Sequence, residues 1–261
     1  MSPHPPTQPT AQVATEVVGD GVARVRWGAA DALDDVRRAV ADALEEHPRV
    51  EALVGVDDQE GQRTATWSGM RREGVRRSGT GDQVVYARLD TDVPVHEPGG
   101  FRALLNSFLP RKRAIGQMLL RDAPAAGTEP RVLLCQLTYK RDWDLPGGVV
   151  EVGESPQGAV VREVAEELAL DVPAGRLLLT DWLPPWGGWD DALCLVFDGG
   201  VHDAAVADRI VKQEREIADA QFCTLAQVHE RAADFTARRV EAALAALADG
   251  TAPFSESGRL V

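Results

Sequence analysis

The chain of 261 residues has few cysteines and no long apolar run. Its three cysteines, Cys135, Cys194 and Cys223, are widely spaced, so they form neither a disulfide framework nor a CxxC metal site, and we expect buried, reduced thiols. No segment reaches the roughly 18 consecutive apolar residues of a membrane span. Residues 1–15 lack the basic-then-apolar layout of a signal peptide. These absences predict a cytoplasmic protein without a membrane partner.

Basic residues are also in deficit. The chain has 28 Lys and Arg against 41 Asp and Glu, a formal net charge of −13 at pH 7. Such a chain repels nucleic-acid backbones, so we expect no nucleic-acid polymer as a partner. The arginines at 71, 72, 76 and 77 have no interleaved aromatics and are interpreted as a solvated face. A small anionic substrate stays compatible with this charge, because a bound divalent cation reverses the local field.

The length and the 44% apolar content favour two domains. Residues 1–20 are rich in proline and predict a disordered tail. The first domain, 21–92, has a strand-like segment at 22–27, a helix capped by Asp31 and ending near Glu46, a turn near 68–74, and strands at 50–56 and 83–89. The proline- and glycine-rich stretch 93–100 is predicted to be a linker.

The second domain is predicted to span 101–250, followed by a C-terminal tail at 251–261. A helix-like start at 101–113 leads to strands at 114–121 and 132–139, a long helix beginning near Ser155, strands at 177–182, 191–197 and 220–224, and helices at 225–233 and 236–248. Strands and helices in this irregular order indicate an α+β fold or an α/β/α layered domain.

One short segment of this domain concentrates acids. Glu154 follows Gly148, and Arg162, Glu163, Glu166 and Glu167 come shortly after it. Ser155 and Pro156 are good N-cap and N1 residues, so a helix is predicted to start there. The last three glutamates then stand at i, i+3 and i+4 on one helix face. Hard oxygen ligands at this spacing suit Mg²⁺ or Mn²⁺. Arg162 is predicted to pair with Glu154 and tie the preceding loop to the helix.

The segment from Gly148 to Leu170 resembles the signature of the Nudix hydrolase family, G-x5-E-x7-R-E-U-x-E-E-x-G-U, with U apolar. It departs from that signature only at Ala169, where the family has glycine. The flanking residues 143–148 (WDLPGG) and 151–156 (EVGESP) are also similar to the family, and the resemblance covers about 111–247. It implies an α/β/α sandwich and hydrolysis of a phosphoanhydride bond in a small phosphorylated substrate.

The same resemblance implies roles for individual residues. Glu163, Glu166 and Glu167 would be metal ligands together with the carbonyl of Gly147, while Arg162, Glu154 and Gly148 would support the site. Glu167 is our first choice for the base that activates water. In many members of the family a later acid does this, and Glu216 lies in the matching region; a solvated loop charge is the alternative reading of Glu216.

Two further groups of residues bear on the substrate. Three tryptophans, Trp182, Trp186 and Trp189, lie in a Pro/Gly-rich segment and could stack a nucleobase, although core packing or a dimer contact is an equal alternative. Lys140 and Arg141 precede the WDLPGG segment and could reach substrate phosphates, or serve as counter-charges to the acidic centre.

Residues 50–89 resemble the C-terminal half of GNAT-type N-acetyltransferases, with features such as residues 69–74 (GMRREG) and 84–89 (VVYARL). That family binds the pyrophosphate of acetyl-CoA on a glycine-containing loop at a helix N-terminus. Nothing upstream of Asp31 supplies this loop, and Gly79-Thr80-Gly81 is interpreted as a turn. A truncated module of this kind is expected to serve packing or homodimer formation.

Three functions follow from these patterns. The leading one is a Mg²⁺-dependent pyrophosphohydrolase acting on a nucleotide or a nucleoside diphosphate-linked molecule. The alternatives are a Nudix-type regulator that binds nucleotides without turnover, and an acetyltransferase.

Overall fold

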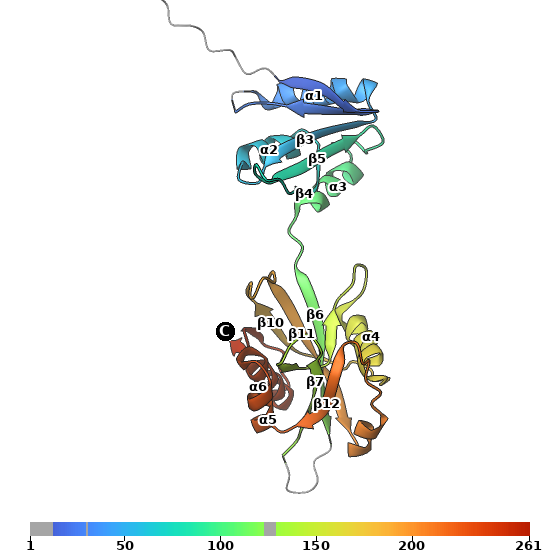
Figure 1. The fold of residues 1–261 in the computed structure, drawn as a ribbon, viewed down its shortest axis with the longest axis vertical. Coiled ribbons are helices and arrows are strands. Elements are labelled where there is room, and N and C mark those ends of the chain that lie inside the picture. Colours follow the sequence, from blue (N-terminus) through green and yellow to red (C-terminus); the bar gives the residue numbers. More distant parts are fainter. Residues whose placement is uncertain (1–12, 30, 123–128) are drawn as a thin grey trace, which may run out of the picture. The chain divides into compact units, whose positions relative to one another are not determined.

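The computed structural model of the chain describes residues 13–29, 31–122 and 129–261. The chain divides into two compact units, an N-terminal unit of residues 1–110 and a C-terminal unit of residues 111–261 (Figure 1). The predicted linker 93–100 leads into helix α3 (Pro98–Phe108), which belongs to the N-terminal unit. Pro98 occupies the first turn of this helix, and Ser107 Oγ accepts a hydrogen bond from the backbone N–H of Arg72. The division therefore falls at Pro110, beyond the predicted linker.

The N-terminal unit contains one sheet with the strand order β1-β2-β3-β5-β4. Its strands are β1 (Ala14–Gly19), β2 (Val22–Arg26), β3 (Arg49–Gly55), β4 (Arg71–Arg76) and β5 (Gln83–Leu89). Helices α1 (Leu33–Glu46) and α2 (Gln59–Trp67) supply Val36, Val40 and Ala65 to a core shared with buried residues of β2, β3 and β5. The pairing of β2 with β3 is parallel, and every other pairing in this sheet is antiparallel.

Three expectations for this unit need correction. Part of the predicted tail is strand β1, which pairs with β2 across a turn at Gly21, where φ is +71°; residues 1–12 of that tail lie outside the described residues. The cap of α1 is Ala32, because the Asp31 carboxylate accepts instead from the N–H of Gly28 at 2.7 Å. The predicted turn at 68–74 is shorter than expected and ends before Arg71, because β4 begins at that residue.

The C-terminal unit is built on a nine-stranded sheet. The order is β12-β7-β6-β11-β10-β13-β14, with β8 beside β7 and β9 beside β6. The strands are β6 (Arg113–Asp122), β7 (Val132–Leu137), β8 (Trp143–Asp144), β9 (Gly147–Val149), β10 (Leu177–Leu183), β11 (Ala192–His202), β12 (Ile217–Cys223), β13 (Phe254–Glu256) and β14 (Arg259–Leu260). Strands β6 and β11 run parallel along the middle of the sheet.

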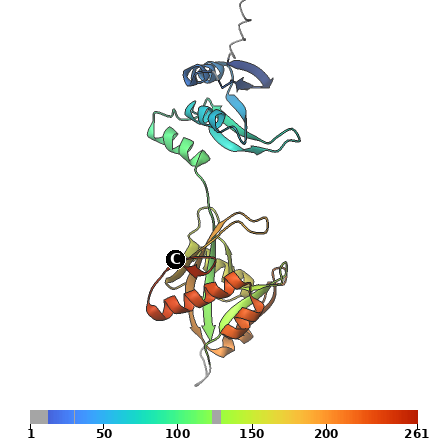
Figure 2. The ribbon, with the colours of Figure 1, turned by 90° about the vertical axis from the view of Figure 1, so that its left-hand side faces the viewer.

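Helices cover both faces of this sheet. Helix α4 (Pro156–Leu168) lies on one side and helices α5 (Leu225–Arg231) and α6 (Asp234–Asp249) on the other (Figure 1), and Figure 2 shows α6 lying across its face. Side chains alternate between the two faces of a strand. In β6, Met118 and Leu120 therefore join the core under α4, whereas Leu119 joins the core under α6. The predicted α/β/α layering of this domain is confirmed.

The predicted C-terminal tail is also ordered. Strands β13 and β14 form a hairpin, and β13 pairs with β10. The buried carboxylate of Asp181 anchors the hairpin by accepting from Ser255 Oγ and from the N–H of Gly258, both at 2.8 Å. Because these bonds satisfy a buried charge, they fix a segment that has no apolar periodicity of its own.

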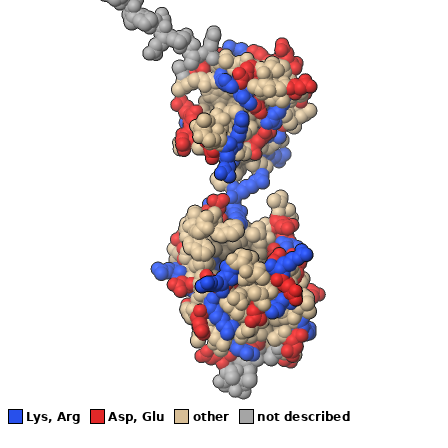
Figure 3. Space-filling model, in the orientation of Figure 1, with Lys and Arg blue, Asp and Glu red and all other residues tan. Residues whose placement is uncertain are grey.

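The expectation for the cysteines is met. All three cysteines are buried and free, and burial raises the pKa of the Cys194 thiol to about 11. No helix in the described part of the chain is long and apolar enough to cross a membrane. On the faces presented in Figure 3, Lys and Arg side chains lie among Asp and Glu side chains, and Arg71 of the arginine cluster pairs with Asp92 at 2.9 Å.

Candidate active site

Helix α4 carries the acidic segment and begins where its capping residues predict. Ser155 is the N-cap, with its Oγ accepting from the N–H of Gly158 at 3.0 Å, and Pro156 follows at the first helical position. The buried side of the helix consists of Ala159, Val160, Val164 and Leu168, and Glu167 shares that side. The apolar packing therefore holds one carboxylate inside the protein.

Glu167 is 4% exposed, and its Oε2 accepts a hydrogen bond from the backbone N–H of Gly147 at 3.0 Å. Burial is the main cause that raises the pKa of Glu167 to about 8, and the charges of Glu163 and Glu216 raise it further. A carboxyl group with such a pKa, below a loop and beside other acids, is a typical feature of a functional site.

The glycines of the loop allow it to lie directly on the helix and on β6. Gly147 has φ +135°, and a Cβ there would stand 2.1 Å from the carbonyl oxygen of Gly116. A Cβ on Gly148 would stand 2.5 Å from the Glu163 carboxylate carbon. Any side chain at either position would displace the loop or the acid. Glycine is therefore required at both positions, because the loop backbone lies so close to its neighbours.

Arg162 links the loop to the helix. Its Nε and Nη2 donate to the two carboxylate oxygens of Glu154, each at 3.0 Å, which confirms the predicted pair. Nη2 also donates to the carbonyl of Val149 at 3.3 Å. The hydrogen bonds that Arg162 donates to Glu154 are the main cause that lowers the pKa of Glu154, and the same bonds raise the pKa of Arg162. A bidentate fork of this kind fixes orientation as well as charge.

The three glutamates of the helix face lie at different depths. The side chain of Glu166 is 59% exposed and that of Glu163 is 16% exposed, and both pair with Nη1 of Arg162 at 3.0 Å, while Glu167 is buried. Burial raises the pKa of Glu163 despite the opposing effect of Arg162. Within 13–29, 31–122 and 129–261, no three His, Cys, Asp or Glu side chains already converge as a metal-binding group.

These residues nevertheless fit a hard divalent cation. Burial raises the pKa values of Glu163 and Glu167, so a cation beside these two carboxyl groups would favour their ionised forms. Carboxylate and carbonyl oxygens are the ligands that Mg²⁺ and Mn²⁺ prefer.

Glu216 is brought to this site by the loop after the 3₁₀ helix (Ala204–Arg209). The backbone N–H groups of Val211 and Gln213 donate to the carbonyls of Leu168 and Glu167, at 3.0 and 2.9 Å, and so cap the end of α4. Glu216 follows in the same loop, is exposed, and acts electrostatically on both Glu163 and Glu167. The catalytic role of Glu216 stays a prediction.

The two candidate phosphate-binding cations differ. Lys140 pairs with Asp144 at 2.8 Å, which matches its reading as a counter-charge, whereas Arg141 is exposed. Burial acts to raise the pKa of Asp144, but Lys140, Arg239 and a hydrogen bond from Gln117 together lower it.

Sequence reasoning missed a buried network behind the loop. Gln117 donates from Nε2 to Asp144 Oδ1 at 2.8 Å and accepts from Arg239 Nη1 at 3.0 Å. Arg239, 1% exposed, also donates from Nε to Asp181 Oδ2 at 2.8 Å. Asp181 lies at an inward-facing position of an apolar strand, and Arg239 lies within an alanine-rich helix. Two opposite charges at core positions indicate a buried ion pair, and this pattern could have revealed the network.

The tryptophan segment forms the tip of the β10–β11 hairpin. Trp186 and Trp189 pair across Gly187 and Gly188, which have φ values of +58° and +86°. The two indoles are 65% and 59% exposed, which excludes core packing for them, while Trp182 is half-buried and its Nε1 donates to Asp191. Trp186 meets Phe235 edge-on at 5.8 Å, and the Arg113 guanidinium lies 4.9 Å from the Trp189 ring centre.

Comparison with known proteins identifies the family. The family model described as "NUDIX domain" matches residues 110–244, more than half of the chain. The chain therefore belongs to the Nudix family, and pyrophosphohydrolase is the enzyme class that this membership supports. The match leaves the N-terminal unit unassigned.

One curated relative shares a short segment. A protein of Bacillus subtilis (strain 168), named "Putative ADP-ribose pyrophosphatase YjhB", is 42% identical over 50 residues, which span 19% of this chain and 24% of the relative. The chain thus matches about a quarter of that relative's length.

Solved structures resemble the chain at lower identity. A MutT protein from Methanosarcina mazei Go1 is 21% identical, with 55% of this chain and 99% of that chain covered and a TM-score of 0.43. A UDP-X diphosphatase is 19% identical, with 63% and 76% covered and a TM-score of 0.47. The NUDIX domain of Shewanella oneidensis NrtR, complexed with ADP ribose, is 20% identical, with 53% and 90% covered and a TM-score of 0.45.

Proposed function

We propose that the C-terminal unit is a Mg²⁺- or Mn²⁺-dependent hydrolase that cleaves a phosphoanhydride bond in a nucleoside diphosphate-linked small molecule. The observation that carries the proposal is the buried Glu167 carboxyl group, held by the Gly147 N–H beside Glu163 and Arg162. A purely structural helix has no need of an acid at this depth, because burying a carboxyl group costs free energy unless a partner or a function compensates.

The cation would be held by Glu163, Glu166, Glu167 and the carbonyl of Gly147. When bound, it would neutralise phosphate charge and lower the pKa of water. Glu166 is the most exposed of the three acids and pairs with Arg162 at the helix surface, so it can turn toward an incoming cation without rearrangement of the core.

The remaining residues orient the site or transfer protons. Arg162 keeps Glu154 and the 149–154 loop in register with α4 through its fork of hydrogen bonds. We assign proton abstraction from the attacking water to Glu167 or to Glu216. Glu216 is exposed in a loop that caps α4, and an exposed acid can exchange its proton with solvent after each turnover.

Three observations support a nucleoside diphosphate derivative as the substrate. The curated relative, which matches this chain over 50 residues, has the name "Putative ADP-ribose pyrophosphatase YjhB". Trp186 and Trp189 are largely exposed, and an exposed indole can stack on a base. Arg141 is exposed at the start of the loop that leads to Gly147, and Lys140 lies beside it. We therefore place ADP-ribose first among nucleoside diphosphate derivatives.

For the N-terminal unit we propose a non-catalytic role and retain the likeness to half of a GNAT domain as a hypothesis. Helix α1 has no side-chain cap and carries Asp34 and Asp35 in its first turn. Acids at this position disfavour the binding of a pyrophosphate to the helix N-terminus. This argues against acetyl transfer as the activity of the protein.

The test is a substrate screen with the full chain. Nucleoside triphosphates, nucleotide sugars, ADP-ribose, dinucleotides and CoA are each incubated with Mg²⁺, and phosphate is measured after coupling to a phosphatase. We expect turnover of at least one nucleoside diphosphate derivative that EDTA abolishes. Saturable nucleotide binding without turnover of any compound would instead support a nucleotide-binding regulator. Acetyl transfer from acetyl-CoA would support an acetyltransferase.

A further inference from the structure

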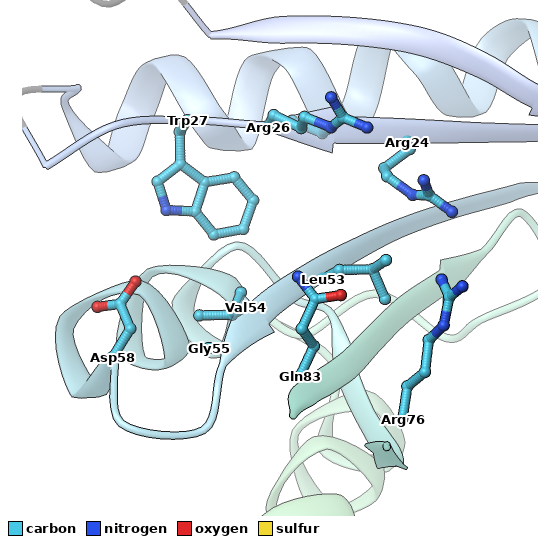
Figure 4. A pocket seen from close by; sticks show the side chains of 10 residues that line it. Arg24, Arg26, Trp27, Leu53, Val54, Gly55, Asp58, Arg76 and Gln83 are labelled. Atoms are coloured by element: carbon cyan, nitrogen blue, oxygen red, sulfur yellow. The ribbon is translucent and has the colours of Figure 1, made fainter. Parts of the chain in front are cut away.

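The N-terminal unit contains a cavity where two neighbouring strands separate. Strands β2 and β3 pair in parallel only from Val22–Arg24 to Arg49–Glu51, while the far edge of each stays paired with β1 or β5. Beyond these residues a cavity of about 450 Å³ opens between them (Figure 4). This volume lies within the range of small-molecule sites, roughly 300–1,000 Å³.

One end of the cavity is basic. Arg24 and Arg26 come from β2 and Arg76 comes from β4, and Figure 4 shows Arg24 and Arg76 facing each other at this end, with Arg26 next to Arg24 on β2. Arg24 is paired with Glu51 and with Glu16, and Arg26 is paired with the same Glu16, whereas Arg76 has no carboxylate within ion-pair distance among the described residues. Three guanidinium groups against two carboxylates leave a positive excess, and the guanidinium fork matches the geometry of a phosphate group.

The other end offers a flat surface and an acceptor. The Trp27 indole and the Asp58 carboxylate lie at the end away from Arg24 and Arg76, with Leu53 and Gln83 between the two ends (Figure 4). Asp58 uses Oδ1 to accept from the N–H of Gly61 at 2.8 Å, and Oδ2 makes no hydrogen bond within the described residues. An indole stacks on an aromatic ring, and a free carboxylate oxygen accepts from an amino group on that ring.

We propose that this cavity binds a nucleoside monophosphate, with its phosphate at Arg24, Arg26 and Arg76 and its base on Trp27. An exocyclic amino group of the base donates to Asp58. A purely apolar ligand would leave Arg76 and Gln83 without a partner in the cavity, and inorganic phosphate would leave the Trp27 end unused. The site lies within the N-terminal unit and its occupation does not depend on the hydrolytic function proposed above.

The test measures binding of AMP to the full chain by isothermal titration calorimetry in the presence of EDTA. AMP has no phosphoanhydride bond, and without a divalent cation its binding to the glutamate helix is disfavoured. We expect one saturable site. Adenosine and inorganic phosphate should each bind at least about tenfold more weakly than AMP, because each lacks one half of the contacts.

Two variants locate the site. Arg76→Gln and Trp27→Leu should each weaken AMP binding about tenfold or more. The matched controls are Arg77→Gln, the next arginine along the chain, and Trp67→Leu, an exposed tryptophan outside the cavity; both should leave AMP affinity unchanged. Since Arg76 is exposed at a strand end, its replacement leaves the core intact.

Three results would overturn the proposal. They are the absence of saturable AMP binding, equal AMP affinities in Arg76→Gln and Arg77→Gln, and AMP binding that is lost in Glu167→Gln but kept in Arg76→Gln. Tighter binding of CoA than of AMP would also contradict it, because the cavity as built matches the smaller molecule.

Discussion

The backbone N–H of Gly147 donates to Oε2 of Glu167 over 3.0 Å, so the glycine loop covers a carboxyl group buried on the apolar side of α4. This relationship connects the glycine loop at the start of the family signature with the helix that carries its acids. The loop contributes glycines that allow close approach, and the helix contributes an acid whose pKa is raised to about 8 by burial.

The first prediction concerns the stability of the metal-free protein. Between about pH 4.5 and pH 8, folded Glu167 retains a proton that the unfolded chain has already released, so stability falls as the pH rises through this interval. The contribution has a slope of at most about 1.4 kcal/mol per pH unit. Urea unfolding in EDTA should show that Glu167→Gln gains stability relative to wild type as the pH is raised from 5 to 8. A pH-independent difference would contradict this account of Glu167.

Cation binding should release that proton. A carboxyl group must be ionised to act as a ligand, so Mg²⁺ binding at pH 7 should release close to one proton, and the release should decline above pH 8. Calorimetry in two buffers with different ionisation enthalpies measures the number of protons. Glu167→Gln is the control, and an equal release from that variant would assign the proton to another group.

The helix end provides a prediction about stability alone. Ala169 is the C-cap of α4 and adopts φ +54° and ψ +32°, the left-handed conformation that glycine occupies without strain. Ala169→Gly should therefore raise the free energy of unfolding by about 1 kcal/mol without changing kcat. Ala165→Gly, at an exposed position inside the same helix, should lower it by about 0.5–1 kcal/mol.

Much of this helix could be predicted from the sequence, because its determinants are local. Ser155, Pro156 and the spacing of the apolar residues define where it begins and which side is buried. The depth of each glutamate could not be predicted, since periodicity places Glu163, Glu166 and Glu167 on one face. It does not indicate that the loop at Gly147 and Gly148 covers Glu167 and most of Glu163 while Glu166 stays exposed. Tertiary contacts decide which member of a face is buried.

The elements that the sequence missed depend on long-range polar contacts. The β13–β14 hairpin is anchored to Asp181, which lies 77 positions before Gly258, and Asp181 also accepts from Arg239. Strand β1 is exposed along its whole length and is held by pairing with β2 and by ion pairs from Glu16 to Arg24 and Arg26. Neither segment has an apolar pattern that reveals its structure.

The exposed tryptophans allow a prediction about substrate choice. Trp186→Ala should raise KM for a base-containing substrate about ten- to hundredfold, the value of one stacking contact, and leave kcat nearly unchanged. Because Trp186 is 65% exposed, the loss of stability should be small. Trp67→Ala removes a comparably exposed indole from the N-terminal unit and should leave KM unchanged. A destabilised Trp186→Ala variant with an unaltered KM would assign the ring to a packing role.

The central claim is that the carboxylates of α4 support metal-dependent hydrolysis, and the most direct test is the kcat of Glu166→Gln and Glu167→Gln with the substrate found in the screen, over a Mg²⁺ titration. Each change keeps the side-chain volume and removes a charged ligand, so kcat should fall by about 10² or more with the fold retained. Glu129→Gln, an exposed acid of the same unit outside the helix, serves as the control. Near-normal turnover in both helix variants, at the same Mg²⁺ dependence as wild type, would contradict the account.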